Sequence, residues 1–135
     1  MKARVIVTAV IEKKGQILFG WQKQGRGPYP NTWHLPGGGV NLEDESLEKA
    51  LKREIMEETN LEIDDIKPIG FDEDYTQSNG QDVHYVFLSF SCQVKAGEAK
   101  ASDDLAEVKW VKKEDIKNLK LPKPSVRLFK KLHIL

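Results

Sequence analysis

The alternation of apolar and polar residues predicts a chain that is rich in β-strands. Residues 4–24, "RVIVTAVIEKKGQILFGWQKQ", are rich in β-branched residues on both sides of a polar break, "EKKGQ". They predict two strands joined by a tight turn at Gly15. Residues 25–32 are dense in Gly, Pro and Asn, which is typical of a loop. Three further strands are expected over Ile63–Phe71, Val83–Val94 and Glu107–Val111.

A helix is predicted over residues 46–58, because apolar residues recur there at three- and four-residue spacing. Asp44 or Ser46 can cap its start, and Asn60 can end it in the left-handed conformation. We expect the apolar stripe of this helix to pack in the core; it consists of Leu47, Ala50, Leu51 and Ile55.

Two shorter helical patterns follow. Residues 112–119, "KKEDIKNL", predict a short helix, and residues 123–135, "KPSVRLFKKLHIL", predict a basic amphipathic one. No internal repeat or linker interrupts these elements, so the pattern predicts a single mixed α/β (α+β) domain over residues 1–135. The apolar face of the last helix would carry Leu128, Phe129, Leu132 and Leu135.

Composition and charge narrow the classes of partner. The chain has 135 residues, with 21 Lys and Arg against 21 Asp and Glu. A net charge of zero argues against binding to a nucleic acid polymer through bulk positive charge, although a small phosphate ligand needs only local chemistry. Cys92 is the one cysteine, and no segment is long enough to span a bilayer. We therefore expect a cytoplasmic protein that binds neither a membrane nor a nucleic acid polymer.

Three carboxylates continue the apolar stripe of the predicted helix. Glu54, Glu57 and Glu58 lie at its carboxyl end, where the helix dipole disfavours negative charge. On a partly buried face they are costly unless cations neutralise them, and Arg53 cannot balance three charges. Oxygen ligands at this spacing suit Mg²⁺ or Mn²⁺. The alternative interpretation is a charged helix end in contact with solvent.

A glycine run precedes this helix. In residues 35–40, "LPGGGV", three glycines follow a proline and let the backbone come close to a ligand. A loop with no ligand is the alternative interpretation. A glycine run that leads into a strongly acidic helix favours a binding site.

Residues 39–61, "GVNLEDESLEKALKREIMEETNL", resemble the Nudix box. That motif is Gly, five residues, Glu, seven residues, then Arg-Glu-aliphatic-any-Glu-Glu-any-Gly-aliphatic. Asn60 stands where the family has Gly, and Asn tolerates the left-handed conformation well. "NTWHLPGGGV" and "AEVKWVKKEDI" extend the resemblance over almost the whole chain. The matching positions of the box are Gly39, Glu45, Arg53, Glu54, Ile55, Glu57, Glu58 and Leu61.

The resemblance implies an α/β/α sandwich with a mixed sheet and a loop-helix-loop catalytic motif. It also implies hydrolysis of a nucleotide pyrophosphate linkage by water, assisted by Mg²⁺ or Mn²⁺. The implied metal ligands are Glu57, Glu58 and the Gly39 carbonyl, with Glu54 as a ligand or as the base that activates water. Arg53 would orient these glutamates by charge-assisted hydrogen bonds, and Glu45 would pair with Arg53 or with the helix start rather than bind metal. A loop carboxylate could also be the base: Asp103, Asp104 or Glu107.

A looser resemblance points to members that cleave a nucleoside triphosphate to a monophosphate and pyrophosphate. A nucleoside diphosphate sugar hydrolase and a catalytically inactive nucleotide-binding module are the alternatives, and both a monomer and a homodimer stay open. Trp21, Tyr29 or Tyr85 could stack on a base, and Lys23, Arg26 or His84 could meet phosphate. Tyr85 could instead pack within the sheet. The predicted substrate-binding residues are Arg26, Tyr29, His34, Gly38 and Tyr85.

Overall fold

A seven-stranded mixed sheet forms the centre of the computed structural model, which describes residues 1–135 except for the Ser78 side chain. The strand order is β3-β2-β1-β6-β5, with β4 paired to β1 and β7 paired to β2. Only the β1–β6 pair is parallel among the described strand pairs. The strands are β1 (Lys2–Lys13), β2 (Gln16–Gln22), β3 (Trp33–His34), β4 (Gly37–Gly39), β5 (Glu62–Ser78), β6 (Gln81–Ala96) and β7 (Leu105–Lys112).

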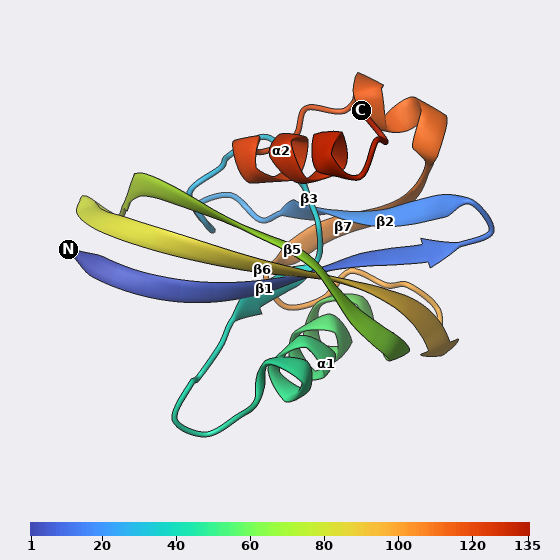
Figure 1. Cartoon of the computed structure of the whole chain (residues 1–135), viewed down its shortest axis with the longest axis horizontal. Coiled ribbons are helices and arrows are strands. Elements are labelled where there is room, and N and C mark those ends of the chain that lie inside the picture. The colour runs from blue at the N-terminus through green and yellow to red at the C-terminus, as the bar shows by residue number, and fades with distance from the viewer.

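Helices cover both faces of the sheet. The helix α1 (Leu47–Thr59) lies on one face, and the 3₁₀ helix η1 (Lys113–Asn118) and α2 (Lys123–Lys131) lie on the other (Figure 1). Each face has its own apolar core. Ala50, Leu51 and Ile55 of α1 pack in one, and Leu128 and Phe129 of α2 pack in the other. The predicted α/β/α sandwich and the predicted apolar stripe of α1 are therefore confirmed. None of the described helices has the length and apolar character needed to cross a membrane.

The parallel pairing of β1 with β6 sets the floor of a cleft. Val7 and Ala9 face α1 and are fully buried, so the residues between and before them face the opposite side of the sheet. The register pairs Arg4 with Tyr85, Ile6 with Phe87 and Thr8 with Ser89. The Thr8 and Ser89 hydroxyls are 3.0 Å apart. Two strands distant in sequence thus present one shared row of side chains.

The ends of α1 explain why the helix starts and stops where it does. The Ser46 hydroxyl accepts a hydrogen bond from the Lys49 amide at 3.2 Å, so Ser46, not Asp44, caps the start. Asn60 adopts the left-handed conformation, with φ 63° and ψ 21°, and its amide donates to the Met56 carbonyl at 3.1 Å. The predicted stop at Asn60 is confirmed.

Three predicted elements were wrong in extent or type. The strand β5 runs to Ser78, well beyond its predicted end at Phe71, whereas β6 begins at Gln81, close to its predicted start at Val83. The polar stretch "DEDYTQ" of β5 did not look strand-like because β5 is an edge strand whose outer part is open to solvent. The glycine run, expected as a loop, forms β4. The helix α2 ends at Lys131, so Leu135 is exposed and does not extend its apolar face.

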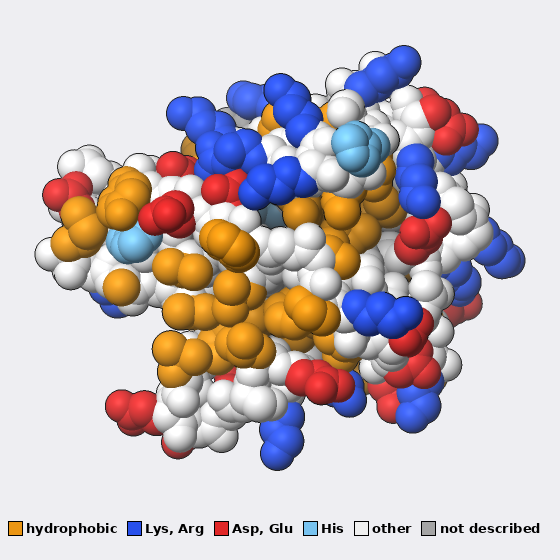
Figure 2. Space-filling view, viewed as in Figure 1, with side chains coloured by type: hydrophobic (Ala, Val, Ile, Leu, Met, Phe, Trp, Pro, Cys, Tyr) orange, Lys and Arg blue, Asp and Glu red, His pale blue; other side chains and the backbone are white. Residues whose placement is uncertain are grey.

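The basic residues of α2 face outward, and Figure 2 shows Lys and Arg side chains gathered over that helix, above a hydrophobic area on the sheet. Two of these residues also tie α2 to β5. The Arg127 guanidinium pairs with the Asp72 carboxylate, and the Lys131 ammonium donates to the Phe71 carbonyl at 3.3 Å. The helix is therefore held over the sheet by polar contacts as well as by its apolar core.

A pair of substitutions tests the helix stop. We expect Asn60→Gly to leave the free energy of unfolding nearly unchanged, because Gly enters the left-handed region without strain. We expect Asn60→Val to lower it by roughly 1 kcal/mol or more, because a β-branched residue resists positive φ. Urea denaturation of both variants measures the difference, and equal stability of the two would contradict the assignment.

Candidate active site

The carboxyl end of α1 packs directly against β4, and the two together line one side of a cleft. The cleft is lined on one side by Gly37–Gly39, Glu54 and Glu58, and on another by Asp103 and Asp104. The loop at 25–29 borders the opening, and the row of β1 and β6 side chains forms the floor. Four carboxylates therefore line a single cavity. Such a cavity is strongly unfavourable for an anion unless cations enter with it.

Arg53 holds the acidic residues of α1 and its preceding loop together. Its guanidinium makes two bonds to Glu45, Nη2 to Oε1 at 2.6 Å and Nε to Oε2 at 3.0 Å. Its Nη1 donates to Glu54 at 3.0 Å and to Glu57 at 3.3 Å, and Nη2 reaches the Gly39 carbonyl at 3.3 Å. The Arg53 hydrogen bonds hold the pKa of the Glu45 carboxyl at about 2. Arg53 thus has the geometry predicted for an orienting residue.

Each glycine of β4 lies where a side chain would collide with a neighbour. A Cβ on Gly37 would meet the Val7 carbonyl, and one on Gly38 would meet the Glu54 carboxylate. A Cβ on Gly39 would lie 2.7 Å from an Arg4 nitrogen. The run of three glycines therefore lets the backbone of β4 approach both β1 and the carboxylates of α1.

Burial shifts the ionisation of two glutamates. Glu58 is only 5% exposed, and its Oε1 accepts a hydrogen bond from the Gly37 amide at 2.9 Å. Burial, followed by repulsion from Glu54, Asp104 and Asp103, raises the pKa of Glu58 to about 8. Burial, with smaller contributions from Glu57 and Asp103, also raises the pKa of Glu54. Raised carboxyl pKa values in a cleft are typical of functional sites.

The expectation that all three glutamates continue the buried stripe was wrong for Glu57. Its side chain is 43% exposed and does not line the cleft, whereas the Glu54 side chain is 14% exposed. Glu57 lies beside the cleft because its bond to Arg53 holds it there. The helix rotates by about 100° per residue, so position 57 turns further toward solvent than positions 54 and 58.

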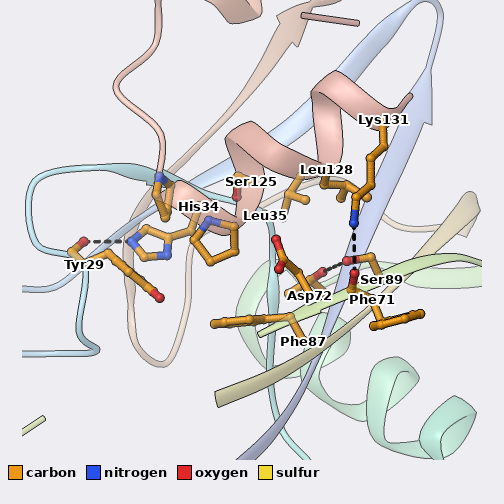
Figure 3. A pocket seen from close by; sticks show the side chains of 13 residues that line it. Tyr29, His34, Leu35, Phe71, Asp72, Phe87, Ser89, Ser125, Leu128 and Lys131 are labelled. Atoms are coloured by element: carbon orange, nitrogen blue, oxygen red, sulfur yellow. Dashed lines mark hydrogen bonds between the residues drawn. The ribbon is translucent and has the colours of Figure 1, made fainter. Parts of the chain in front are cut away.

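An apolar pocket adjoins the cleft beneath α2. Figure 3 shows Phe71, Asp72 and Phe87 of the sheet opposite Leu128 and Lys131 of α2. Other lining residues are shared with the cleft, so the two cavities lie next to each other. The shared residues are Thr8, Tyr29, His34, Leu35 and Phe87.

Tyr29 and His34 lie at the junction of the two cavities. The Tyr29 hydroxyl donates to Asp74, and its ring is 6.5 Å from that of Phe87. Burial and the Asp74 bond raise the pKa of the Tyr29 hydroxyl. Burial lowers the pKa of His34, whose Nε2 contacts the Thr32 hydroxyl at 2.9 Å and the Tyr29 carbonyl at 3.0 Å. Both residues therefore stay uncharged near neutral pH.

The predicted substrate-binding residues all line the cleft, although each role stays a prediction. Tyr85 is buried within the sheet and stacks on Phe87 at 5.8 Å, so it also has the packing role considered for it. Arg26 is paired with Asp104 at 3.6 Å. The cleft-lining members are Arg26, Tyr29, His34, Gly38 and Tyr85.

Several other candidates lie elsewhere. Trp21 and Lys23 border a neighbouring hollow beside the 23–31 loop and do not line the cleft itself. Glu107 of β7 pairs with Trp21 of β2 and does not line the cleft either. His84 binds Glu73 at 2.9 Å and stacks on Tyr75 at 4.2 Å, outside the cleft. Both Asp103 and Asp104 do line the cleft.

Sequence reasoning missed Arg4, Thr8 and Phe87, all of which line the cleft. The alternation of β1 places Arg4 and Thr8 on the face opposite Val7, so that part was readable from the sequence. Phe87 required the β1–β6 register, which local patterns do not contain.

The comparisons with known proteins agree with this geometry. The family model of the NUDIX domain matches residues 1–132. The nucleoside triphosphatase NudI of Escherichia coli O17:K52:H18 is 33% identical over 123 residues, which is 86% of each chain. A NUDIX hydrolase from Nitrosomonas europaea superposes with a TM-score of 0.79 and 25% identity, covering 98% of this chain and 89% of that one.

A second solved structure gives the same result. The MutT NUDIX hydrolase from Burkholderia pseudomallei superposes with a TM-score of 0.76 and 25% identity, covering 95% of this chain and 97% of that one. The family match spans nearly the whole sequence, and three residues of the box, Gly39, Glu54 and Glu58, line the cleft. The chain belongs to the Nudix family, and it is a Nudix pyrophosphohydrolase.

Proposed function

We propose that this enzyme hydrolyses a nucleoside triphosphate to a monophosphate and pyrophosphate, with Mg²⁺ or Mn²⁺ as its cofactor. The observation that carries the proposal is the position of Glu54 and Glu58 on the wall of a cleft that shares Tyr29, His34 and Phe87 with an adjoining pocket. The similar Escherichia coli protein is named a nucleoside triphosphatase, which supports this substrate class.

The donor atoms fit a hard divalent cation. Glu54, Glu57, Glu58 and the Gly39 carbonyl supply only oxygen, which Mg²⁺ and Mn²⁺ prefer. Among the described side chains, no three ligating groups converge closely enough here to form a complete cation site. Arg53 and the Gly37 amide hold the glutamate oxygens instead. A bound divalent cation would neutralise the carboxylates, polarise phosphate oxygens and lower the pKa of water.

The chain's own residues supply orientation and proton transfer. We assign Glu57, Glu58 and the Gly39 carbonyl to the cation and Arg53 to fixing Glu54 and Glu57 through its Nη1 bonds. Glu54 would take a proton from the attacking water. Its raised pKa brings its basicity closer to neutral pH, which favours a general base.

The nucleoside has a matching environment beneath α2. Tyr29 and Phe87 offer aromatic faces for a base, and Leu128 and Leu35 offer apolar surface. His34 and Gly38 border the path from this pocket to the glutamates, and Arg26 and Tyr85 line its sides. A base in the pocket would direct the phosphates toward Glu54 and Glu58.

The first prediction concerns stability without metal. The folded-state pKa of Glu58, about 8, lies above its ordinary value of 4.5, so the folded protein binds this proton more tightly than the unfolded chain. The parent should lose stability as pH rises from about 5 to 8. At about 1.4 kcal/mol per pKa unit, we expect Glu58→Gln in EDTA to be more stable than the parent at pH 8 by roughly 1–3 kcal/mol.

This gain should fade toward pH 5, where the parent carboxyl is protonated in the folded state. Urea denaturation across this pH range measures it. Glu48→Gln is the matched control, because Glu48 is exposed in the first turn of the same helix and pairs only with Lys52 at 3.6 Å. A Glu58→Gln protein that is less stable than the parent at pH 8 would show that the carboxylate is structural.

The second prediction concerns activity. Glu57→Gln should lower turnover by two or more orders of magnitude and remove most of the increase in melting temperature that Mg²⁺ gives the parent, since a ligand of the folded state stabilises it. Product analysis over nucleoside triphosphates and nucleoside diphosphate sugars measures the reaction, with Glu48→Gln as the control. Sugar phosphate as the main product would indicate the sugar nucleotide alternative. No turnover of any nucleotide would indicate an inactive binding module.

A further inference from the structure

Arg4 lines the cleft, and among the described residues its guanidinium forms no salt bridge with a carboxylate. In the part of the chain that the structure describes, no Asp or Glu oxygen lies within 4.0 Å of its guanidinium. The other two arginines near the cleft are engaged. Arg53 binds Glu45, Glu54 and Glu57, and Arg26 pairs with Asp104.

The Arg4 guanidinium lies beside the β4 backbone and lines the cleft. One of its nitrogens lies over Gly39, 2.7 Å from where a Cβ would be, and Arg4 lines the cavity together with Glu54. Thr8, on the same face of β1, borders the apolar pocket. Four residues of strand separate Arg4 from Thr8, about 13 Å at 3.3 Å per residue. The glutamates thus lie between an apolar end and a cationic end.

We propose that Arg4 binds the terminal phosphates of the substrate, which leave as pyrophosphate. The proposal rests on the proposed function, because it assumes a nucleoside beneath α2 and reacting phosphates at the glutamates. In that orientation the phosphates farthest from the base reach Arg4. Guanidinium forks bind phosphate oxygens through two parallel hydrogen bonds, and Arg4 has no competing carboxylate to displace.

The reaction gives this contact a role. Water adds to one phosphorus, the bridging P–O bond breaks, and one product keeps the electron pair of that bond. A proton leaves the attacking water, so a triphosphate and water give a monophosphate, pyrophosphate and a proton. Arg4 offsets the charge on the pyrophosphate group. It therefore favours substrates with two phosphates beyond the first, which makes it a specificity-determining residue.

The test compares inhibition by the two products. We expect Arg4→Ala to weaken inhibition by pyrophosphate in Mg²⁺ by roughly 10-fold, the cost of one charge-assisted hydrogen-bonded contact. Inhibition by the nucleoside monophosphate should change less than about twofold, since that product lies at the other end of the cleft. Arg4→Lys should fall between, because Lys keeps the charge without the fork.

Lys2→Ala is the matched control. Lys2 lies on the same face of β1, and its replacement by Ala removes the same charge. Lys2 borders a hollow beside the cleft that Arg4 and Glu54 also line, but it does not line the cleft itself. Inhibition of the Lys2→Ala variant by pyrophosphate should stay close to that of the parent. The proposal would be overturned if Lys2→Ala and Arg4→Ala weakened inhibition by pyrophosphate equally. It would also be overturned if Arg4→Ala weakened inhibition by pyrophosphate and by the monophosphate equally.

Gly39→Ala provides a second, charge-neutral variant. The added methyl would occupy the space beside the Arg4 guanidinium and displace it, while the Gly39 carbonyl is retained. If Arg4 acts as proposed, Gly39→Ala should weaken pyrophosphate inhibition in the parent and much less in the Arg4→Ala background, a non-additive pair. Full additivity would mean that the two changes act independently, which contradicts the proposal.

Calorimetric titration with pyrophosphate and Mg²⁺ separates this proposal from the proposed function. If the parent releases no pyrophosphate from any nucleoside triphosphate, the proposed function fails. The contact between Arg4 and pyrophosphate is then tested by direct binding alone. Roughly 10-fold weaker binding to Arg4→Ala than to the parent would support the contact, and equal binding or no binding to the parent would overturn it.

Discussion

The main constraint on this protein is the burial of negative charge at the end of α1. Glu58 is almost completely buried, Glu54 is largely so, and Asp103 and Asp104 face them across the cleft. Their mutual repulsion and desolvation oppose folding of the metal-free protein. Arg53 relieves only part of this cost, since its guanidinium is shared among three carboxylates. A cation that enters with a polyphosphate would relieve the rest. The same feature thus makes the site costly in the empty protein and suited to a charged substrate.

The remaining structure serves to place that charge. Gly37 and Gly38 bring the backbone of β4 against Val7 and Glu54, which a side chain at either position would hinder, and Gly39 leaves space for the Arg4 guanidinium. The left-handed turn at Asn60 ends α1 directly after the glutamates. The parallel register of β1 and β6 aligns Arg4, Thr8 and Phe87 on the floor of the cleft. The helix α2, held over β5 by Arg127 and Lys131, closes the apolar pocket at the far end.

Local patterns in the sequence predicted the parts of this arrangement that depend on local geometry. The stripe of α1 and the positions of Glu54 and Glu58 next to it follow from a rotation of 100° per residue. The stop at Asn60 follows from the tolerance of Asn for the left-handed conformation. The residue pairs on the floor of the cleft do not follow from local geometry. Thr8 and Ser89 are 81 positions apart and meet only through the strand register. The polar β5 was underestimated because an edge strand needs no continuous apolar face. Leu135 was misplaced because the helical period continues in the sequence after the backbone has left the helix at Lys131.

The ionisation of Glu58 tests the central claim most directly. Carbon-13 NMR of the glutamate carboxyls, with Glu58 assigned by comparison with Glu58→Gln, measures its titration in EDTA and in saturating Mg²⁺. In EDTA we expect a midpoint near 8, raised by burial and by its acidic neighbours. In Mg²⁺ the carboxyl should remain ionised throughout the neutral range, because a cation favours the charged form. A Glu58 carboxyl that titrates near its ordinary value of 4.5 in both solutions would contradict the account.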